Sequence, residues 1–580
     1  MLRPRKPSSS AAAERQAFQT LCRMCDDHCA LNVYMQEGRV VDIDGFAEHP
    51  WNRGRLCNKG RAAADLVYHR ERLWKPLKRT ASGWQEIPLE QALDEIAARV
   101  RDIQARHGAR SIGLWKGEAV GFAQQKETAR RFIHAIGSPN YFSNDSLCFN
   151  GRWIGYAVAH GAWSVPDYGQ ARCIALWGAN PPYAHPNMTQ MIMRARRRGA
   201  RLVVVDPRLS AIARKADVHA APLPGTDGAL AWGLIGLLVG RGDYDRELVG
   251  KHSVGFPRLA EYARGFTPQA VEKESGLPAA TVERIADLMA QASPAVVNYV
   301  GNGLEHHENG INNIRAVAYL DTLLGALDRK GGNRLAESLR TNRLTLYQER
   351  PLTELGPIGA DRFPVLYGLR RECHSMSALD TMLSGRPYPL KGLLLTAANP
   401  ALTNPNTDKV RRALAALELL VVRDLFLTET AQLAHYVLPA ASFLERSELH
   451  AHPMFQVVGL SRKLLSFPGV QDEYQFWHDL AHRLGGGAYF PWAGERARVS
   501  SRVGSIEIPV TVCAPNEILP GTVQITHGYR QANVNLLTPD DLFDPISGFP
   551  LLKAVPVSIE RAADRAAPLG TTGPRPAGTA

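Results

Sequence analysis

Short apolar runs alternate with amphipathic helical segments through most of this chain. Residues 89–107 repeat apolar side chains at helical spacing and stop at Gly108, which predicts an amphipathic helix. Further helices are expected at 123–136, 186–198, 229–239 and 408–416, and strands at 111–115, 173–178, 201–206, 295–300, 392–396 and 419–424. Strands that alternate with helices predict a multi-domain α/β fold built on parallel, Rossmann-like sheets.

The two ends of the chain show a different pattern. Residues 31–43 alternate apolar and polar side chains on both sides of Glu37 and Gly38, which predicts a β-hairpin in a small β-rich subdomain. Near the other end, residues 506–512, 521–526 and 555–559 are strand-like, and we expect a small β-barrel there. The last residues, from 562 onward, are rich in Ala, Pro, Gly and Thr and are expected to form a disordered tail.

Half of the eight cysteines fall in one short arrangement, made of Cys22, Cys25, Cys29 and Cys57. The C-x2-C-x3-C spacing with a later fourth thiol can wrap a cubane [4Fe–4S] cluster, because thiolates are the preferred ligands of such clusters. A zinc site is the alternative, but it usually pairs two C-x2-C units, and the second unit is absent here. The spacing therefore favours an iron–sulfur cluster on loops of the N-terminal β-rich subdomain.

Two further residues carry candidate chemistry. Lys59 follows Cys57 by two residues, and a cation beside a cluster raises its potential; an ordinary exposed lysine is the alternative. Cys148 lies in a polar loop, which is an unusual place for a structural thiol. It could be a metal ligand or a nucleophile, and the local sequence does not choose between the two.

Loops that contain glycine or polar residues follow the predicted strands of the first half of the chain. In parallel sheets, ligands bind beyond the carboxyl ends of the strands, and a terminal Asp can hold a ribose or a guanine edge. No G-x-G-x-x-G turn is present, so the loops do not support NAD. The candidate nucleotide residues here are Gly178, Asn180, Asp206, Arg208, Gly225, Asp227, Gly301 and Gly303.

The same pattern recurs in the second half of the chain. A predicted strand is followed by an Ala-Asn-Pro loop, a helix and a strand that ends in Arg-Asp. An internal duplication that binds one nucleotide is one interpretation, but two bound nucleotides fit the repeated pattern better. The candidate residues in this half are Asn399, Asp424, Thr428 and Thr430.

The composition is that of a globular protein, with 580 residues, 45% of them hydrophobic and 21% charged. A formal net charge of +12 suggests nucleic acid as a partner, but no basic block is interleaved with aromatic residues, and we expect no such partner. The densest basic run, residues 194–198, is interpreted as a solvated helix face. The excess positive charge is better explained as offsetting bound phosphates.

The sequence favours a cytoplasmic location without a direct membrane span. The first residues contain no apolar core after their basic positions and no adjacent arginine pair, so they do not resemble a secretory signal. No run of 18 apolar residues occurs. Cysteines that must remain thiolates for a cluster also indicate a reducing compartment.

The motifs, taken in order, resemble the dimethyl sulfoxide reductase family of molybdenum and tungsten oxidoreductases, which includes formate dehydrogenases and periplasmic nitrate reductases. No single motif is specific, but their order is. Besides the cysteine arrangement, the matching segments are 177–181, 206–208, 224–227, 301–303, 398–400, 428–439 and 527–535.

The resemblance implies a bis(molybdopterin guanine dinucleotide) cofactor that holds one Mo or W atom, and a small-molecule substrate. It makes Cys148 the protein ligand to that metal and Lys59 the link between the cluster and a pterin. It assigns Asp206, Arg208 and Asp227 to one dinucleotide. It assigns Asn399, Asp424, Thr428 and Thr430 to the other, and Asn533 and Asn535 to a pterin.

The resemblance also implies a domain division. The cluster domain would cover residues 19–75, the first dinucleotide-binding domain 141–334, and the second 76–140 together with 335–490. A shortened C-terminal β-barrel would cover 495–562, with disordered tails at 1–18 and 563–580.

Three features depart from the family pattern. Phe149 follows Cys148 where formate dehydrogenases typically have His, which disfavours formate as substrate. Asp26 follows a cluster cysteine, as does the water-activating Asp of acetylene hydratase, a non-redox member; a surface carboxylate is the alternative. The passage from Gly487 to Arg498 is abrupt where relatives carry a long segment, so the C-terminal domain is shortened.

We expect a redox enzyme in which the substrate reacts at the metal. Electrons would pass through the Lys59 region and the cluster to an electron-transfer subunit or a ferredoxin-like partner. The alternatives are a hydratase that uses Asp26 and a degenerate scaffold subunit that no longer holds both cofactors. Candidate residues for the substrate funnel are Arg152, His160, His185 and His374.

Overall fold

The computed structural model describes residues 15–118, 123–336, 343–452, 457–490, 496–509 and 558–561. Contacts divide the chain into two compact units, residues 1–486 and 487–580, which we describe separately. The predicted α/β class with parallel sheets and an N-terminal β-rich part is confirmed. None of the helices within these ranges is both long and apolar enough to cross a lipid bilayer.

The N-terminal part is a three-stranded antiparallel sheet in the order β1-β2-β3. Its strands are β1 (Gln16–Leu21), β2 (Ala30–Gln36) and β3 (Arg39–Gly45), and the short helices α1 (Asn58–Arg61) and α2 (Ala63–Val67) follow. The hairpin predicted at 31–43 is confirmed. The tail predicted for residues 1–18 is wrong for residues 16–18, because these pair with β2 in register.

The first parallel sheet has the order β11-β10-β9-β12. Its strands are β9 (Cys173–Trp177), β10 (Arg201–Val205), β11 (Val218–Ala220) and β12 (Val296–Val300). Every residue of β9 and β12 is buried, as expected for a sheet covered on both faces. One face packs on α7 (Pro186–Arg197), and the other packs on α8 (Asp227–Arg241), α12 (Ala279–Ala292) and α13 (Gly310–Leu323).

The remaining elements of this region surround the sheet. They are α5 (Asn150–His160), α6 (Pro181–Ala184), α9 (Arg246–His252), α10 (Phe256–Ala263) and α11 (Pro268–Ser275), with the two-stranded antiparallel pair β8 (Ser164–Pro166) and β13 (Asn333–Leu335).

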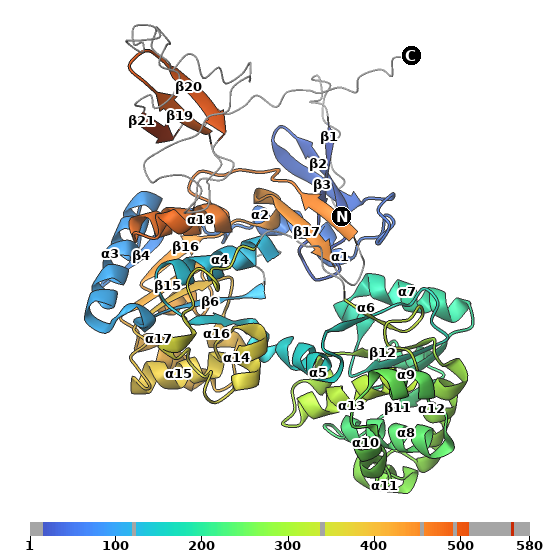
Figure 1. The fold of residues 1–580 in the computed structure, drawn as a ribbon. Helices are drawn as coiled ribbons and strands as arrows, with labels where there is room; N and C mark the ends of the chain where they lie inside the picture. The colour runs from blue at the N-terminus through green and yellow to red at the C-terminus, as the bar shows by residue number, and fades with distance from the viewer. Residues whose placement is uncertain are drawn as a thin grey trace, which may run out of the picture. The chain divides into compact units, whose positions relative to one another are not determined.

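The second sheet joins segments that are far apart in the sequence (Figure 1). Its order is β5-β4-β16-β15-β14-β6-β7, parallel except where β4 and β5 join. The strands are β4 (Leu77–Thr80), β5 (Gly83–Glu86), β6 (Ile112–Lys116), β7 (Tyr141–Ser143), β14 (Gly392–Thr396), β15 (Leu419–Asp424) and β16 (Tyr436–Pro439). The whole first sheet therefore lies, in sequence, between β7 and β14.

Helices cover both faces of this second sheet as well. They are α3 (Leu89–His107), α4 (Ala123–Ala135), α14 (Pro364–Arg370), α15 (Ser375–Ser384), α16 (Pro400–Thr403), α17 (Thr407–Ala415) and α18 (Glu473–Arg483). A separate hairpin consists of β17 (Glu448–His452) and β18 (Val457–Ser461).

In the second unit, the described residues form an antiparallel sheet in the order β20-β19-β21. Its strands are β19 (Arg496–Ser500), β20 (Ser505–Pro509) and β21 (Ser558–Arg561). The rest of the β-barrel predicted for 495–562 lies outside the described residues, as do residues 563–580.

Each parallel sheet contains one topological switch point. In the first sheet, β9 pairs with β10 on one side and β12 on the other. In the second, β6 pairs with β7 on one side and β14 on the other. Connections that leave in opposite directions open a crevice beyond the strand ends, which is where such sheets bind ligands. The predicted nucleotide loops at 178–180, 301–303 and 397–399 lie at these two points.

A buried ion pair joins the end of the cluster region to the second sheet region. Arg72 and Glu445 have side chains 0% and 2% exposed, and the Arg72 guanidinium lies 2.6 Å from Glu445 Oε2. Arg72 also donates to the carbonyl oxygens of Val67 and Ala440, and the amide of Ser442 donates to Glu445. Because the partners belong to separate segments, the pair holds those segments together.

We predict that Glu445→Ala lowers the free energy of unfolding by about 3–5 kcal/mol, since it leaves the Arg72 charge buried without its counter-ion. The matched control is Glu86→Ala, which removes the exposed partner of Lys75 and should cost about 0–1 kcal/mol. The measurement is urea unfolding followed by circular dichroism. Equal losses in the two variants would contradict the prediction.

Candidate functional site

The four motif cysteines lie on neighbouring loops of the N-terminal part. Cys22 follows β1 and Cys29 precedes β2, and the Cys22 amide donates to the Cys29 carbonyl at 2.8 Å. Cys57 stands at the N-terminus of α1. Burial raises the pKa of Cys22 to about 12, and the charges of Cys25 and Cys57 act in the same direction. Buried thiols that repel one another as anions fit a cationic iron–sulfur core, which would hold them as thiolates.

Polar groups surround these thiols. Asn187 Nδ2 donates to Cys29 Sγ at 2.8 Å, so the start of α7 touches the cysteine loop. Burial raises the pKa of Cys25, and the nearby ammonium of Lys59 acts in the opposite direction. The structure therefore places Lys59 near the Cys25 thiol, and its role as the link between the cluster and a pterin stays a prediction.

The two adjacent acids of this loop lie in opposite environments. The Asp26 side chain is 59% exposed and lies 3.6 Å from Arg23 and 3.7 Å from His28. Asp27 is buried, accepts a hydrogen bond from the Asn187 amide at 3.0 Å, and lies 3.2 Å from His185 Nδ1. Sequence reasoning missed Asp27, because two consecutive acids in a loop carry no periodic signal for which of them points inward.

The loops after β9 and β12 meet backbone to backbone. Gly178 has φ +54°, and a Cβ on it would lie 2.9 Å from Gly303 Cα. A Cβ on Gly301 would lie 2.4 Å from the Gly178 oxygen, and Gly303 donates its amide to that oxygen at 3.2 Å. Asn180, at the N-terminus of α6, has a buried Oδ1 without a hydrogen-bond partner among the described residues. An unsatisfied amide at the switch point of a sheet fits a bound polar ligand.

Acidic and basic groups gather beside the same sheet. Burial raises the pKa of Asp227 to about 6. The nearby His307 lowers this pKa, and the charge of Asp206 raises it. His307 Nδ1 would lie 3.3 Å from a Cβ on Gly225. Asp206, Gly225, Asp227 and His307 are therefore neighbours. Asp206 accepts from the Arg208 amide at 2.8 Å, and the Arg208 side chain is exposed. The predicted residues of the first half are thus brought together.

The second half repeats the geometry with different hydrogen bonds. Asn399 begins α16 with φ −128° and ψ 61°, close to the −125° and 70° of Asn180 before α6. Its Oδ1 is already occupied, since Thr430 donates its hydroxyl at 2.8 Å and its amide at 3.1 Å. Thr428 Oγ1 accepts from the Ala431 amide at 3.3 Å. The backbone geometry therefore repeats, but among the described residues the amide oxygen of Asn180 has no partner while that of Asn399 is paired.

A small cavity separates the second sheet from the cysteine loop. It has a volume of about 130 Å³ and is lined by Asp424 at the end of β15 together with Arg23 and Met24 of the loop. Burial raises the pKa of Asp424 to about 6. A larger cavity of about 750 Å³, lined in part by His160, lies among the α10 and α13 side chains instead of at a strand end.

Cys148 lies between the short 3₁₀ turn Asn144–Leu147 and α5. Asn302, in the loop after β12, places its Nδ2 3.8 Å from Cys148 Sγ. Burial raises the pKa of Cys148, the carboxylates of Asp145 and Glu305 raise it further, and Arg152 opposes them. Arg152 lies 2.9 Å from Glu305. The thiol is therefore near the first switch point and is flanked by a charged pair.

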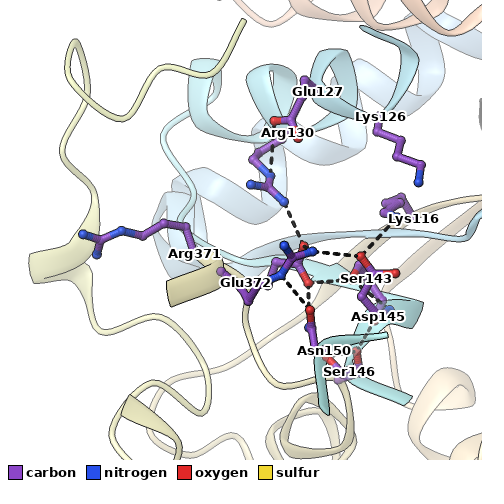
Figure 2. Close-up of polar contacts among 12 residues, drawn as sticks. Lys116, Lys126, Glu127, Arg130, Ser143, Asp145, Ser146, Asn150, Arg371 and Glu372 are labelled. Carbon is purple, nitrogen blue, oxygen red and sulfur yellow. Dashed lines mark hydrogen bonds and ion pairs between the residues drawn. The ribbon is translucent and has the colours of Figure 1, made fainter. Parts of the chain in front are cut away.

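A buried network holds the loop that carries Cys148 (Figure 2). Glu372 accepts from Ser143 at 2.7 Å, from Asn150 at 3.2 Å and from Arg130 at 2.9 Å. Burial alone would lower the pKa of Lys116, but the carboxylates of Asp145 and Glu118 raise it above its usual value. Ser143 and Asn150 flank Cys148, so charged groups clamp both ends of its loop.

The other funnel candidates lie in separate places. His374 caps α15 and accepts from the Ser377 amide. His160, the last residue of α5, forms a hydrogen bond with the Ala318 carbonyl of α13. His185 contacts Asp27, as described above, and of the four only Arg152 is placed beside Cys148. Asn533 and Asn535 lie outside the described residues.

Polar loops at two switch points and a nearby four-cysteine loop are the arrangement expected of a pterin-dinucleotide enzyme with an iron–sulfur cluster. The chain belongs to the molybdopterin oxidoreductase family. The family model for molybdopterin oxidoreductases matches residues 72–473, that for their Fe4S4 domain matches 16–69, and that for the molybdopterin dinucleotide-binding domain matches 493–556. Its cofactors are a [4Fe–4S] cluster and bis(molybdopterin guanine dinucleotide) with Mo or W, which settles the zinc alternative.

Relatives with 26–28% sequence identity match more than 80% of this chain. A thiosulfate reductase molybdopterin-containing subunit of Salmonella typhimurium is 28% identical, over 85% of this chain and 67% of its own length. Acetylene hydratase of Syntrophotalea acetylenica is 28% identical, over 83% of this chain and 71% of its own. The solved acetylene hydratase from Pelobacter acetylenicus superposes with a TM-score of 0.75 at 26% identity, covering 82% of this chain and 70% of that one.

We predict about four irons per chain after anaerobic purification, because four thiolates around a cubane bind four irons. The measurement is iron analysis together with visible absorption. Cys57→Ser should lose most of the iron, while Cys173→Ser, at a buried thiol of β9, should keep it. Tightly bound zinc without iron in the wild-type protein would contradict the prediction.

Proposed function

We propose that this protein catalyses a two-electron oxidation or reduction of a small molecule at the Mo or W centre and exchanges the electrons singly through the cluster. When bound, the metal and its pterins supply the oxygen-atom or hydride-equivalent chemistry. The chain's own residues orient that centre, exclude water and connect it to the cluster. The proposal includes an electron-transfer partner, because electrons that pass through the cluster need a donor or an acceptor. It also includes a cytoplasmic location, since thiolate ligands assemble in a reducing compartment.

One observation carries the proposal: a single short segment reaches both cofactor sites. The segment begins at Gly178 and Asn180, in the loop at the first switch point. It continues through His185 and Asn187, which contact Asp27 and Cys29 of the cysteine loop. A dinucleotide held at its start and a cluster held at its end would be joined by the same stretch of backbone.

We assign roles on this basis. Cys22, Cys25, Cys29 and Cys57 ligate the cluster, and Lys59 lies between the cluster and a pterin. Cys148 ligates the metal. One dinucleotide is held by Gly178, Asn180, Asp206, Arg208, Gly225, Asp227, Gly301 and Gly303, the other by Asn399, Asp424, Thr428 and Thr430, with Asn533 and Asn535 at a pterin.

The geometry favours redox turnover over hydration. A carboxylate that acts as a general base at a metal is usually held inside a cleft by burial and by its neighbours. Asp26 is 59% exposed and is paired with Arg23 and His28. Its environment therefore supports a surface carboxylate, and the likeness to acetylene hydratase supports the fold more than that reaction.

We predict that purified wild-type protein contains Mo or W and guanine nucleotide, and that it reduces or oxidises a dye during substrate turnover. A degenerate scaffold would lack one of the cofactors, and a hydratase would leave the dye unchanged.

Cys148→Ser should alter the electron paramagnetic resonance signal of the metal while the iron content stays unchanged. Cys173→Ala is the matched thiol control, and an unchanged metal signal in Cys148→Ser would remove Cys148 from the site.

We predict that Asp227 makes nucleotide binding depend on pH. Its raised pKa of about 6 means that the carboxyl group is mostly protonated below that value and then loses the charge that strengthens its hydrogen bonds from guanine N–H groups. Between pH 5 and 7 its ionised fraction rises about tenfold, and the affinity of the cofactor-free protein for guanosine diphosphate should rise equally, relative to Asp227→Asn.

Taking the ratio to Asp227→Asn removes the titration of the nucleotide's own phosphate. The matched control is Asp287→Asn, an exposed acid of α12 paired with Arg241, which should keep the wild-type pH dependence. The measurement is equilibrium dialysis at constant ionic strength. A ratio independent of pH would show that Asp227 does not contact the nucleotide.

A further inference from the structure

Five arginines from two segments form a group that we call the arginine patch: Arg53, Arg55, Arg194, Arg197 and Arg198. The sequence suggested only a solvated helix face at 194–198. In the structure, partial burial lowers the pKa of Arg194, and the charges of the four other arginines lower it further. The C-terminal half of α7 therefore lies against the residues that precede Cys57.

Direct contacts connect the patch to the cysteine loop. Arg55 donates to Gln190 Oε1 at 2.6 Å, and Gln190 lies one helical turn beyond Asn187, which contacts Cys29. At a rise of about 1.5 Å per residue, Arg194 lies roughly 10 Å along α7 from Asn187. On the other side, Arg55 precedes the partly exposed Cys57 by two residues. The patch thus borders the cluster site.

The positive charge of the patch is not neutralised within the described part of the chain. Arg53 donates to the Pro50 carbonyl, and Arg198 donates to the carbonyls of Tyr168 and Gly169. None of the five arginines lies within ion-pair distance of a described carboxylate. Arg196, on the same helix, is different because it pairs with Asp217 at 3.2 Å. An uncompensated group of guanidinium ions creates a field that attracts acidic partners.

We propose that the arginine patch docks an acidic one-electron carrier protein of the ferredoxin kind against the edge of the cluster. This rests on the proposed redox function. Each docking event passes one electron, which the cluster loses and the carrier gains or the reverse, so one two-electron turnover uses two carriers. Charge complementarity sets the rate and orientation of such encounters. A nucleic acid is disfavoured, since the basic residues are not interleaved with the aromatic side chains on which bases stack.

The test uses the anaerobic holoprotein and an acidic [2Fe–2S] ferredoxin as probe, titrated by calorimetry at low ionic strength. The patch variant combines Arg55→Gln, Arg194→Gln and Arg197→Gln. The control variant combines Arg258→Gln, Arg264→Gln and Arg412→Gln, which are exposed and remove the same charge elsewhere. We expect the patch variant to bind ferredoxin about tenfold or more weakly, and the control to bind like wild type. In about 1 M salt the difference should vanish.

Equal weakening in the two variants would overturn the proposal, since net charge alone would then explain binding. Binding of a duplex oligonucleotide that is lost only in the patch variant, with ferredoxin binding unchanged, would overturn it in favour of nucleic acid. If the triple variant does not fold, the single exposed substitution Arg197→Glu replaces it.

Reduction of the cluster by dithionite, read from its visible absorption, is measured in every variant. A wild-type protein without a reducible cluster would refute the proposed function, whereas a normal cluster with patch-independent ferredoxin binding refutes only the docking surface. We expect dithionite reduction to be unchanged in the patch variant, because a small reductant does not need the docking surface.

Discussion

The arrangement of both cofactor sites depends on one buried carboxylate. Asp27 is 1% exposed and receives the Asn187 amide at the start of α7, where unpaired amides and the helix dipole favour a negative charge. This contact fixes the cysteine loop against the first parallel sheet, because α7 packs on that sheet through Met188 and Ile192. The same helix start carries the Asn187 side chain that donates to Cys29, so these contacts connect the cysteine loop with the segment that begins at Asn180.

The loops after β9 and β14 have similar backbone geometry but differ in their residues and hydrogen bonds. In the first, Gly178 adopts the left-handed φ of +54° at no steric cost; in the second, Ala397 adopts φ +50° at the corresponding position, where a side chain is strained. Within the described part of the chain the buried oxygen of Asn180 has no hydrogen-bond partner, whereas the oxygen of Asn399 is occupied by Thr430. The two dinucleotides would therefore meet different sites, one poised for a new hydrogen bond and one that must exchange an existing bond.

Much of the scaffold could be predicted from the sequence, because its signals are local. The helix at 89–107 and the strands at 392–396 and 419–424 have the predicted bounds, since apolar periodicity and a terminal Gly or Asp mark them. The contacts that build the site are not local. Glu372 bonds Ser143 across 229 residues, and no pattern near either residue indicates the other. Asp27 was missed for a related reason, since only the position of α7 distinguishes it from Asp26.

The buried network around Glu372 is better explained by the positioning of the Cys148 loop than by a contribution to stability. Replacing a buried ionic cluster by apolar side chains is often neutral or stabilising, so the burial of Lys116, Asp145 and Glu372 is weak evidence that they contribute folding energy. Their contacts instead converge on Ser143 and Asn150, the two ends of the loop that carries Cys148. A ligand loop that must meet a metal at one position benefits from fixed charges, because a polar network holds only the arrangement that satisfies every partner. The same residues belong to the second sheet region, so the network also ties the position of Cys148 to the half of the protein proposed to hold the second dinucleotide.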